Sequence, residues 1–291
     1  MLPRMSFVAL LMIVVAGALH AGWNALTKRS SDQLAFCWGL TGAIALLCAP
    51  LVAITIWIDG VDAVGLRYMV ASGLIHIGYF ALLAAAYRTS ELGLAYPVSR
   101  GMGVLLIPIA SATLLNVAPR PAAWIGIVLI AIGIVWLHIG AFEAAYHKRG
   151  WHGVISWFAL ANGVVIATYS LIDARGVQTL HPIIYNYGQM TIAFVGLTAW
   201  FLFTRSTDRL APVIASPRMA AIAGIGSYIT YTLVLAATRL APVAYVGPMR
   251  EVSIVFGVFI GARMFGERMT SGRILGVSLI VIGIITIKVI G

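Results

Sequence analysis

Long apolar segments separated by short polar ones dominate the chain. Each is close to the length of roughly 20 apolar residues that an α-helix needs to cross a bilayer. They are much longer than the roughly 10-residue alternating strands of a membrane barrel. We therefore predict an all-α integral membrane protein with ten transmembrane helices. The segments cover residues 7–25, 34–57, 64–86, 95–115, 122–141, 154–172, 183–203, 220–237, 244–265 and 274–290.

The two halves of the chain resemble one another. Residues 126–134 (GIVLIAIGI) match residues 276–284 (GVSLIVIGI), which lie 150 positions further on. Residues 83–88 (LAAAYR) resemble residues 234–239 (VLAATR) in the same order along the chain. Matches at nearly constant separation indicate an internal repeat.

An odd number of helices in each repeat inverts the second repeat relative to the first. Inverted repeats are typical of secondary transporters, in which the substrate binds near mid-membrane between the repeats. Rocking of one repeat against the other then exposes the site to each side in turn. We predict a five-helix repeat over residues 1–145, a short basic linker at 146–150 and an inverted five-helix repeat over 151–291.

The composition supports the membrane assignment. Of the 291 residues, 61% are hydrophobic and 10% are charged, whereas an ordinary soluble domain is about 45–50% apolar and about 25% charged. The net charge of +10 comes from basic residues at helix ends, where they contact lipid headgroups, so we expect no nucleic-acid partner. We expect a multi-pass protein of a bacterial inner (plasma) membrane, present as a monomer or homodimer.

The basic residues also predict an orientation. With ten crossings both termini lie on one side, whose loops hold 6 Lys and Arg, while the opposite loops hold 11. The side richer in Lys and Arg is generally cytoplasmic. This count places both termini outside.

Two arginines within apolar segments are the strongest candidates for a substrate site. Ionisable residues inside a membrane are costly and generally face a cavity or the bundle interior. Arg100 and Arg250 occupy nearly matching positions in the two repeats. Arginine can hold a carboxylate or phosphonate through two parallel hydrogen bonds. The alternatives are that each arginine extends to the interface or pairs with Glu251 or Asp173.

Each of these arginines closely follows a proline. Proline removes a backbone donor and kinks a helix, and interrupted helices of transporters expose backbone groups to substrate. Pro97 and Gly101 flank Arg100, and Pro248 precedes Arg250. We predict that Pro97, Gly101 and Pro248 are hinges for the bending of these two helices during transport.

Other polar and aromatic side chains in the apolar segments are predicted to line the same cavity. His20 and Asn24, four residues apart, share one helix face. The alternative is that such groups only form hydrogen bonds between helices. Tyr185 and Tyr187, near the start of a segment, are instead expected to be interfacial anchors. The predicted binding set comprises Arg100, Arg250, Trp23, His20, Asn24, His76, Tyr79, Tyr169 and Tyr231.

The sequence carries no pattern of catalytic or cofactor chemistry. Its histidines lack the paired spacing with a carboxylate that metal sites use. No glycine-rich phosphate loop follows a strand, and no set of nucleophile, base and acid stands out. We therefore expect neither an enzyme nor a bound metal or other cofactor.

A motif near the end of the second half resembles a known family. Residues 265–270 (FGERMT), followed by a last helix with glycines at 276 and 283, are similar to the end of an EamA repeat. That repeat closes with a Gly-Glu-x-x-Thr/Ser turn before a helix with spaced glycines. In the first half, residues 116–119 (NVAP) stand where the Gly-Glu turn is expected, so the repeats have diverged.

The resemblance implies an EamA-like member of the drug/metabolite transporter superfamily, with ten helices around a central cavity. Members of that superfamily carry amino acids, including aromatic ones, nucleotide sugars, sugar phosphates and drugs. Small multidrug relatives use an acidic residue in the first helix for proton coupling, and this first helix has none. Residues 20–28 (HAGWNALTK) also resemble a subgroup associated with phosphonate use.

We expect a secondary transporter, and specifically an exporter, of small zwitterionic or anionic metabolites. Amino acids are the leading candidates for the small-molecule substrate, and alternating access between the repeats is the expected mechanism. The rival hypotheses are a carrier of phosphonates or other phosphorylated metabolites, a lipid-headgroup flippase and a multidrug exporter.

Overall fold

The computed structural model describes residues 5–28, 30–89, 92–149, 157–266 and 269–290. These residues form helices joined by short connections, and no strand occurs among them. The helices are α1 (Phe7–Lys28), α2 (Gln33–Leu47), α3 (Ala49–Asp59), α4 (Ala63–Thr89), α5 (Leu92–Leu114), α6 (Pro121–Leu137), α7 (Ile139–Arg149), α9 (Trp157–Gly176), α10 (Pro182–Phe203), η1 (Thr207–Leu210), α11 (Ala211–Ala215), α12 (Pro217–Leu240), α13 (Val243–Met249), α14 (Val252–Phe265) and α15 (Ser271–Ile290).

Every apolar segment predicted from the sequence is mostly helical where the structure describes it, with short breaks at Cys48, His138 and Arg250–Glu251. Within the described ranges, five spans are long and apolar enough to cross a membrane, and the bent pair of α2 and α3 makes a sixth if it is counted as one span. Residues 98–114 of α5 and the whole of α6 are apolar but shorter. The all-α membrane class is confirmed, while the count of ten crossings stays a prediction.

Two of the differences from the predicted pattern have a simple local cause. The segment at 34–57 is divided into α2 and α3, which are bent by 51°. Pro50 lies in the first turn of α3, and it has no N–H to donate to the preceding turn, which favours a bend at this point. Residues 146–149, predicted as linker, instead extend α7, because this part of the chain is rich in good helix formers such as alanine, glutamate, lysine and arginine.

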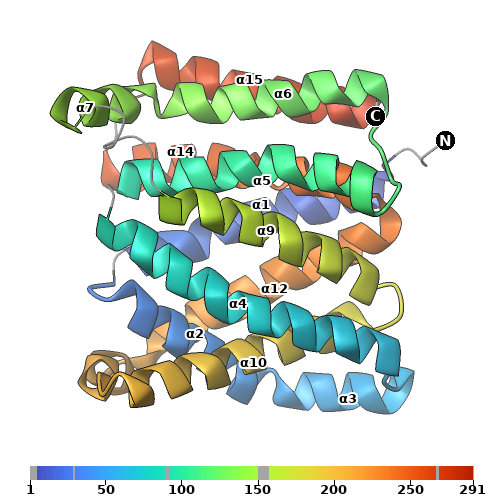
Figure 1. The fold of residues 1–291 in the computed structure, drawn as a ribbon, viewed down its shortest axis with the longest axis vertical. Helices are drawn as coiled ribbons and strands as arrows, with labels where there is room; N and C mark the ends of the chain where they lie inside the picture. Colours follow the sequence, from blue (N-terminus) through green and yellow to red (C-terminus); the bar gives the residue numbers. More distant parts are fainter. Residues whose placement is uncertain (1–4, 29, 90–91, 150–156, 267–268, 291) are drawn as a thin grey trace.

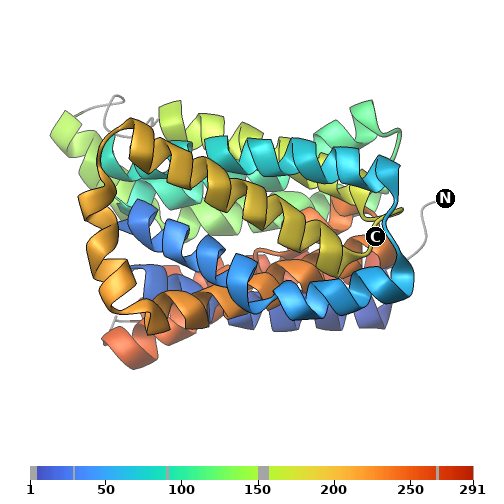
Figure 2. The ribbon, with the colours of Figure 1, turned by 90° about the horizontal axis from the view of Figure 1, so that it is seen from below.

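The helices lie side by side, with their connections gathered at two ends of the bundle (Figures 1 and 2). Helix α1 packs against α12 and α14, while α9 packs against α4 and α5. Helix α2 contacts both α10 and α12, and α6 pairs with α15 at one edge of the molecule. The residues before α1 meet the last helix at one end, where Lys288 Nζ of α15 donates a hydrogen bond of 2.5 Å to the carbonyl oxygen of Met5.

Glycines bring α6 and α15 into backbone contact. A Cβ atom added at Gly283 would lie 2.6 Å from the carbonyl oxygen of Gly126, and one added at Gly133 would lie 2.8 Å from that of Gly276. Small residues allow such close approach of helices in membranes. The repeated glycine segments noted in the sequence are therefore the two sides of one helix pair.

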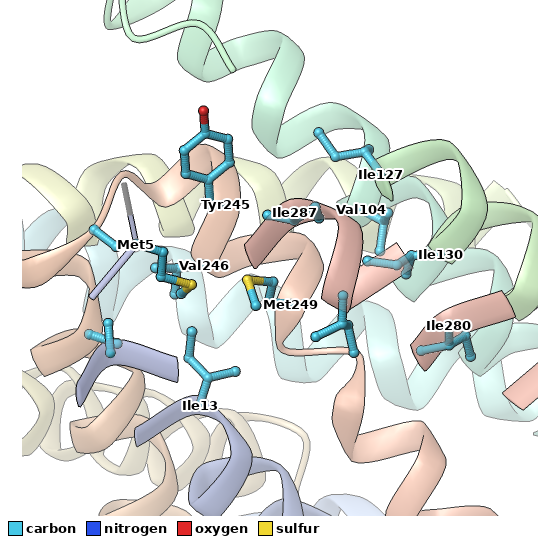
Figure 3. Close-up of a cluster of buried hydrophobic side chains, with 14 of the residues drawn as sticks. Met5, Ile13, Val104, Ile127, Ile130, Tyr245, Val246, Met249, Ile280 and Ile287 are labelled. Atoms are coloured by element: carbon cyan, nitrogen blue, oxygen red, sulfur yellow. The ribbon is translucent and has the colours of Figure 1, made fainter. Parts of the chain in front are cut away.

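A buried apolar cluster lies between this helix pair and the rest of the bundle. Ile127 and Ile130 of α6 face Ile280 and Ile287 of α15 in the cluster (Figure 3). Side chains at the start of the chain and on α1, α5 and α13 also belong to it, among them Met5, Ile13, Val104, Tyr245, Val246 and Met249. The cluster runs along this helix pair from Ala123 to Ile134 of α6, and it includes Met5 near the N-terminus.

The turn after α5 has a left-handed backbone residue, as the turn after α14 does, although the first half lacks the Gly-Glu motif. Gly266, which ends α14, has a φ of 66°, in the left-handed region. Asn116, after the end of α5, has a φ of 54°. Asparagine adopts this conformation more readily than most residues because its side chain can form local hydrogen bonds. Asn116 thus takes the backbone conformation that a glycine takes in the second half, whereas Glu267 lies outside the described residues.

We predict that Gly283→Ala destabilises the protein while Gly257→Ala does not. The new methyl group at residue 283 meets the backbone of α6, whereas nothing lies within 4 Å of a Cβ at residue 257. Overpacking of this kind costs about 1–3 kcal/mol. Thermal unfolding in detergent should show a lower Tm for Gly283→Ala only, and equal Tm values for the two variants would contradict the helix contact.

Candidate functional site

A cavity of about 130 Å³ lies in the middle of the bundle. Its walls come from α1, α2, α4, α5, α9, α10 and α12, together with the residue that follows α13. All nine predicted binding residues line it: His20, Trp23, Asn24, His76, Tyr79, Arg100, Tyr169, Tyr231 and Arg250. Side chains far apart in the sequence therefore share one site, and their role in binding stays a prediction.

The cavity extends toward the end of the bundle opposite the chain termini. On α1 its lining runs from Ile13 to Thr27 in the last turn, and on α2 it includes Gln33, the first residue. At the other end of the bundle, Met5 and Ala9 belong to the buried apolar cluster. Packed side chains thus separate the cavity from the end that carries the termini.

A break between α13 and α14 positions two charged residues in the centre of the protein. Pro248 lies inside α13, and Arg250 and Glu251 form the turn before α14 begins. The amide of Glu251 donates to the carbonyl oxygen of Pro248 over 3.1 Å, a spacing of three residues that tightens the turn. This break falls at a predicted hinge, Pro248, whereas α5 runs past Pro97 and Gly101 without a recorded interruption.

Arg100 and Glu251 form a buried ion pair that joins α5 to this turn. Arg100 Nε donates to Glu251 Oε2 over 3.1 Å, and Arg100 Nη2 lies 2.9 Å from Oε1. The two side chains are only 10% and 5% exposed. Two parallel contacts are the strongest geometry for an arginine and a carboxylate. The positive charge of Arg100 is therefore matched within the protein, which was one of the alternatives for this residue.

Arg250 lies against aromatic rings instead. Its guanidinium carbon is 5.5 Å from the centroid of the Tyr231 ring, a favourable cation–π arrangement. Its guanidinium also faces the hydroxyl of Tyr169. Among the described residues, no carboxylate lies within ion-pair distance of Arg250. Arg250 is thus the cavity arginine whose charge lacks an anionic partner.

Aromatic rings from three helices form one wall of the cavity. The His76 and Tyr169 rings are 4.4 Å apart, the Tyr79 and Tyr169 rings 5.9 Å, and the Tyr169 and Tyr231 rings 6.2 Å. These distances fall in or near the range of favourable ring pairs. The wall brings together residues of α4, α9 and α12.

Unpaired polar atoms face the cavity from other helices. The indole Nε1 of Trp23 is buried and has no hydrogen-bond partner among the described residues. The same holds for both polar atoms of the Asn162 side chain, which is 1% exposed and lines the cavity. Buried polar groups are costly when unpaired, so these atoms are available to a polar ligand. Sequence reasoning missed Asn162, whose signal was an amide within an apolar segment.

Sequence reasoning also misplaced the groups around Asp173. Among the described residues no arginine forms an ion pair with this aspartate. The Tyr185 hydroxyl donates to its Oδ1 over 2.9 Å, and the Tyr231 hydroxyl donates to its Oδ2. The expectation that Tyr185 is an interfacial anchor is wrong, because its side chain is fully buried. Tyr187 also bonds within the protein, to the carbonyl oxygen of Ala45 over 2.9 Å. The need to satisfy a buried carboxylate outweighs the preference of tyrosine for the interface.

Titratable side chains do not gather into a metal site in this part of the molecule. Within the ranges that the structure describes, no group of three or more His, Cys, Asp or Glu side chains is placed to hold a metal ion.

We predict that Arg100→Met lowers the Tm and that adding Glu251→Met largely restores it. The single change leaves Glu251 as a buried charge without its partner, and breaking such a pair costs about 3–5 kcal/mol. The double variant replaces both charges by apolar groups. Thermal unfolding in detergent measures the difference, and a double variant as unstable as the single one would contradict the pairing.

Comparisons with known proteins agree with the fold and the resemblance. No curated protein matches the chain in sequence. A solved structure, whose title reads only "Crystal structure of protein", is 18% identical and aligns with a TM-score of 0.73 over 97% of this chain and 96% of that chain. This likeness shows a shared fold. Residues 154–289 match the model of the EamA-like transporter family, which confirms the resemblance seen in the closing turn. The second half of the chain is thus similar to the EamA-like transporter family.

Proposed function

We propose that the protein carries small organic anions and zwitterions, with amino acids as the leading candidates, by alternating access. The observation that carries this proposal is the cavity charge of Arg250, which has no anionic partner among the described residues. A cation enclosed by low-dielectric surroundings interacts strongly with an anion that enters. A carboxylate is the simplest metabolite group to supply that anion.

The surroundings of Arg250 fit a small acid. Its planar guanidinium can donate two parallel hydrogen bonds to a carboxylate. The Tyr169 and Tyr231 rings flank it and leave an apolar surface for the rest of the substrate. For a zwitterion, the faces of the aromatic wall and the free amide oxygen of Asn162 can receive the ammonium group. The site thus offers complementary partners to both ends of an amino acid.

The size of the cavity favours a small metabolite over a drug. Its volume is about 130 Å³, whereas sites for drug-sized ligands are about 300–1,000 Å³. The cation in the cavity also repels the lipophilic cations that multidrug exporters carry. These points argue against the multidrug hypothesis.

The packing of the helices supports a pair of inverted repeats. If α1 corresponds to α9, α4 to α12 and α5 to α13 with α14, each contact has a counterpart: α1 with α12 mirrors α9 with α4, and α1 with α14 mirrors α9 with α5. Reciprocal contacts of this kind are expected of two similar units related by a two-fold axis. In this arrangement α6 and α15 are counterparts that pack on each other.

The shape of the cavity supports alternating access. It extends toward one end of the bundle only, while packed side chains fill the other end. Arg250 and Glu251 lie in the turn after Pro248. Bending at Pro248 would therefore move both Arg250 and the ion pair between Glu251 and Arg100. We infer that Pro248 acts as the hinge and that the opposite opening forms in the alternate state.

A phosphonate is the second candidate substrate. Its oxygens can accept two parallel hydrogen bonds from a guanidinium, so Arg250 would bind the anionic group in both cases. His20 also lines the cavity, and as an additional polar group it favours a headgroup with more than two oxygens. Competition between the two ligand classes separates the hypotheses.

We predict that Arg250→Gln weakens substrate exchange by about 10- to 100-fold in apparent affinity, since hydrogen bonds to charged groups contribute about 1.5–3 kcal/mol. The measurement is counterflow in proteoliposomes, with aromatic and aliphatic amino acids, 2-aminoethylphosphonate, a sugar phosphate and a lipophilic cation. The control is Arg263→Gln, which removes an exposed arginine from α14.

Exchange of amino acids lost in Arg250→Gln and kept in Arg263→Gln would support the proposal. Selective exchange of the phosphonate would favour the second candidate. An Arg250→Gln variant with unchanged affinity would show that Arg250 does not hold the substrate. Failure of every soluble compound to exchange, with the protein shown to be folded, would favour lipid translocation.

A further inference from the structure

Asp173 is a buried carboxylate just outside the cavity lining. Its side chain lies near the C-terminal end of α9 and is 1% exposed. Tyr185 of α10 and Tyr231 of α12 each donate a hydroxyl hydrogen bond to one of its oxygens. Both donors are neutral groups, so they satisfy the carboxylate without balancing its charge.

The other buried acid, Glu251, differs in this respect. Its two oxygens contact the guanidinium of Arg100, which fixes it as the anionic half of an ion pair. Asp173 has no such cation within ion-pair distance among the described residues. An unpaired buried carboxylate is costly, and binding a proton removes that cost. Asp173 is therefore the acid for which a neutral state is chemically accessible.

The titratable groups around Asp173 come from several helices. His76 of α4 acts on it electrostatically, and Ser72 of the same helix can hydrogen-bond to it. Tyr185 approaches from α10 and Tyr231 from α12. Arg250 acts on His76 and Tyr231 in turn. The carboxylate therefore lies where helices of both halves of the chain meet.

Tyr231 connects this carboxylate to the substrate cavity. Its hydroxyl donates to Asp173, its ring lines the cavity, and the guanidinium of Arg250 lies over that ring at 5.5 Å. An anion held by Arg250 would touch the same tyrosine that holds Asp173. Charge at the two sites is thus linked through one side chain.

We propose that Asp173 is a proton-binding site that couples substrate movement to proton movement through Tyr231. The inference rests on the proposed transport function and adds the coupling ion to it. The step is a simple proton transfer: the carboxylate takes one proton from the cavity water and becomes a carboxylic acid, and no other bond changes. The acid then donates one O–H, so one of the two tyrosine hydroxyls can accept this bond instead of donating to the carboxyl group.

Infrared pH-difference spectra of the detergent-solubilised full chain test proton binding without any substrate. We expect a carbonyl band of a protonated carboxylic acid in the wild type and its loss in Asp173→Asn. Asp208→Asn, which changes an exposed aspartate, should keep the band. Tyr185→Phe removes one donor and leaves the cavity lining intact, so it should shift the pH profile of the band.

Flux in proteoliposomes tests coupling, with labelled L-phenylalanine and 2-aminoethylphosphonate as probes. We expect wild-type protein to accumulate a probe against its gradient when a pH gradient is imposed. Asp173→Asn should keep counterflow and lose this accumulation. Accumulation that survives in Asp173→Asn, or a carboxylic acid band that the variant retains, would overturn the proposal. If the wild type exchanges neither probe, the proposed substrate class fails, while the infrared band still decides whether Asp173 binds a proton.

Discussion

The structure depends on how charge is balanced within a membrane-embedded core. Arg100 and Glu251 neutralise each other directly, whereas neither Arg250 nor Asp173 forms an ion pair with another described residue. Tyr231 lies between them, with its ring under Arg250 and its hydroxyl on Asp173. A direct ion pair between Arg250 and Asp173 would leave neither charge available to a ligand or a proton. Their separation by a tyrosine keeps the cation available to a ligand and the acid available to a proton.

The sequence predicted the helical class well because a lipid environment imposes a simple pattern. Backbone groups in a bilayer must bond within their own segment, so long apolar runs are helical. The details that it missed are local. Whether the chain bends by 51° at α3 or continues straight depends on how Pro50 is packed, and prolines at 97 and 248 look alike in sequence although only the second lies at a helix break.

The candidate site was also largely predictable, since polar side chains within apolar segments must face the interior. What sequence reasoning could not supply is which of them pair. Arg100 and Arg250 occupy equivalent positions, yet only Arg100 meets Glu251, a residue 151 positions away. Glu251 follows Arg250 in the second half, but Gly101 follows Arg100 in the first half. The ion pair therefore has no counterpart in the other half. Asn162 was missed because it is a single amide within an apolar segment, and the sequence could not show that Asp173 bonds to tyrosines and not to an arginine.

The central claim is that Arg250 recognises the negative charge of the substrate, and ligand binding to the purified protein tests it most directly. Titration calorimetry would compare the acid that exchanges best with its uncharged amide, in the wild type and in Arg250→Gln. The account predicts that the wild type binds the acid much more tightly than the amide and that Arg250→Gln binds both equally weakly. Equal affinity of the wild type for acid and amide, or a preference for the acid that survives in Arg250→Gln, would contradict it.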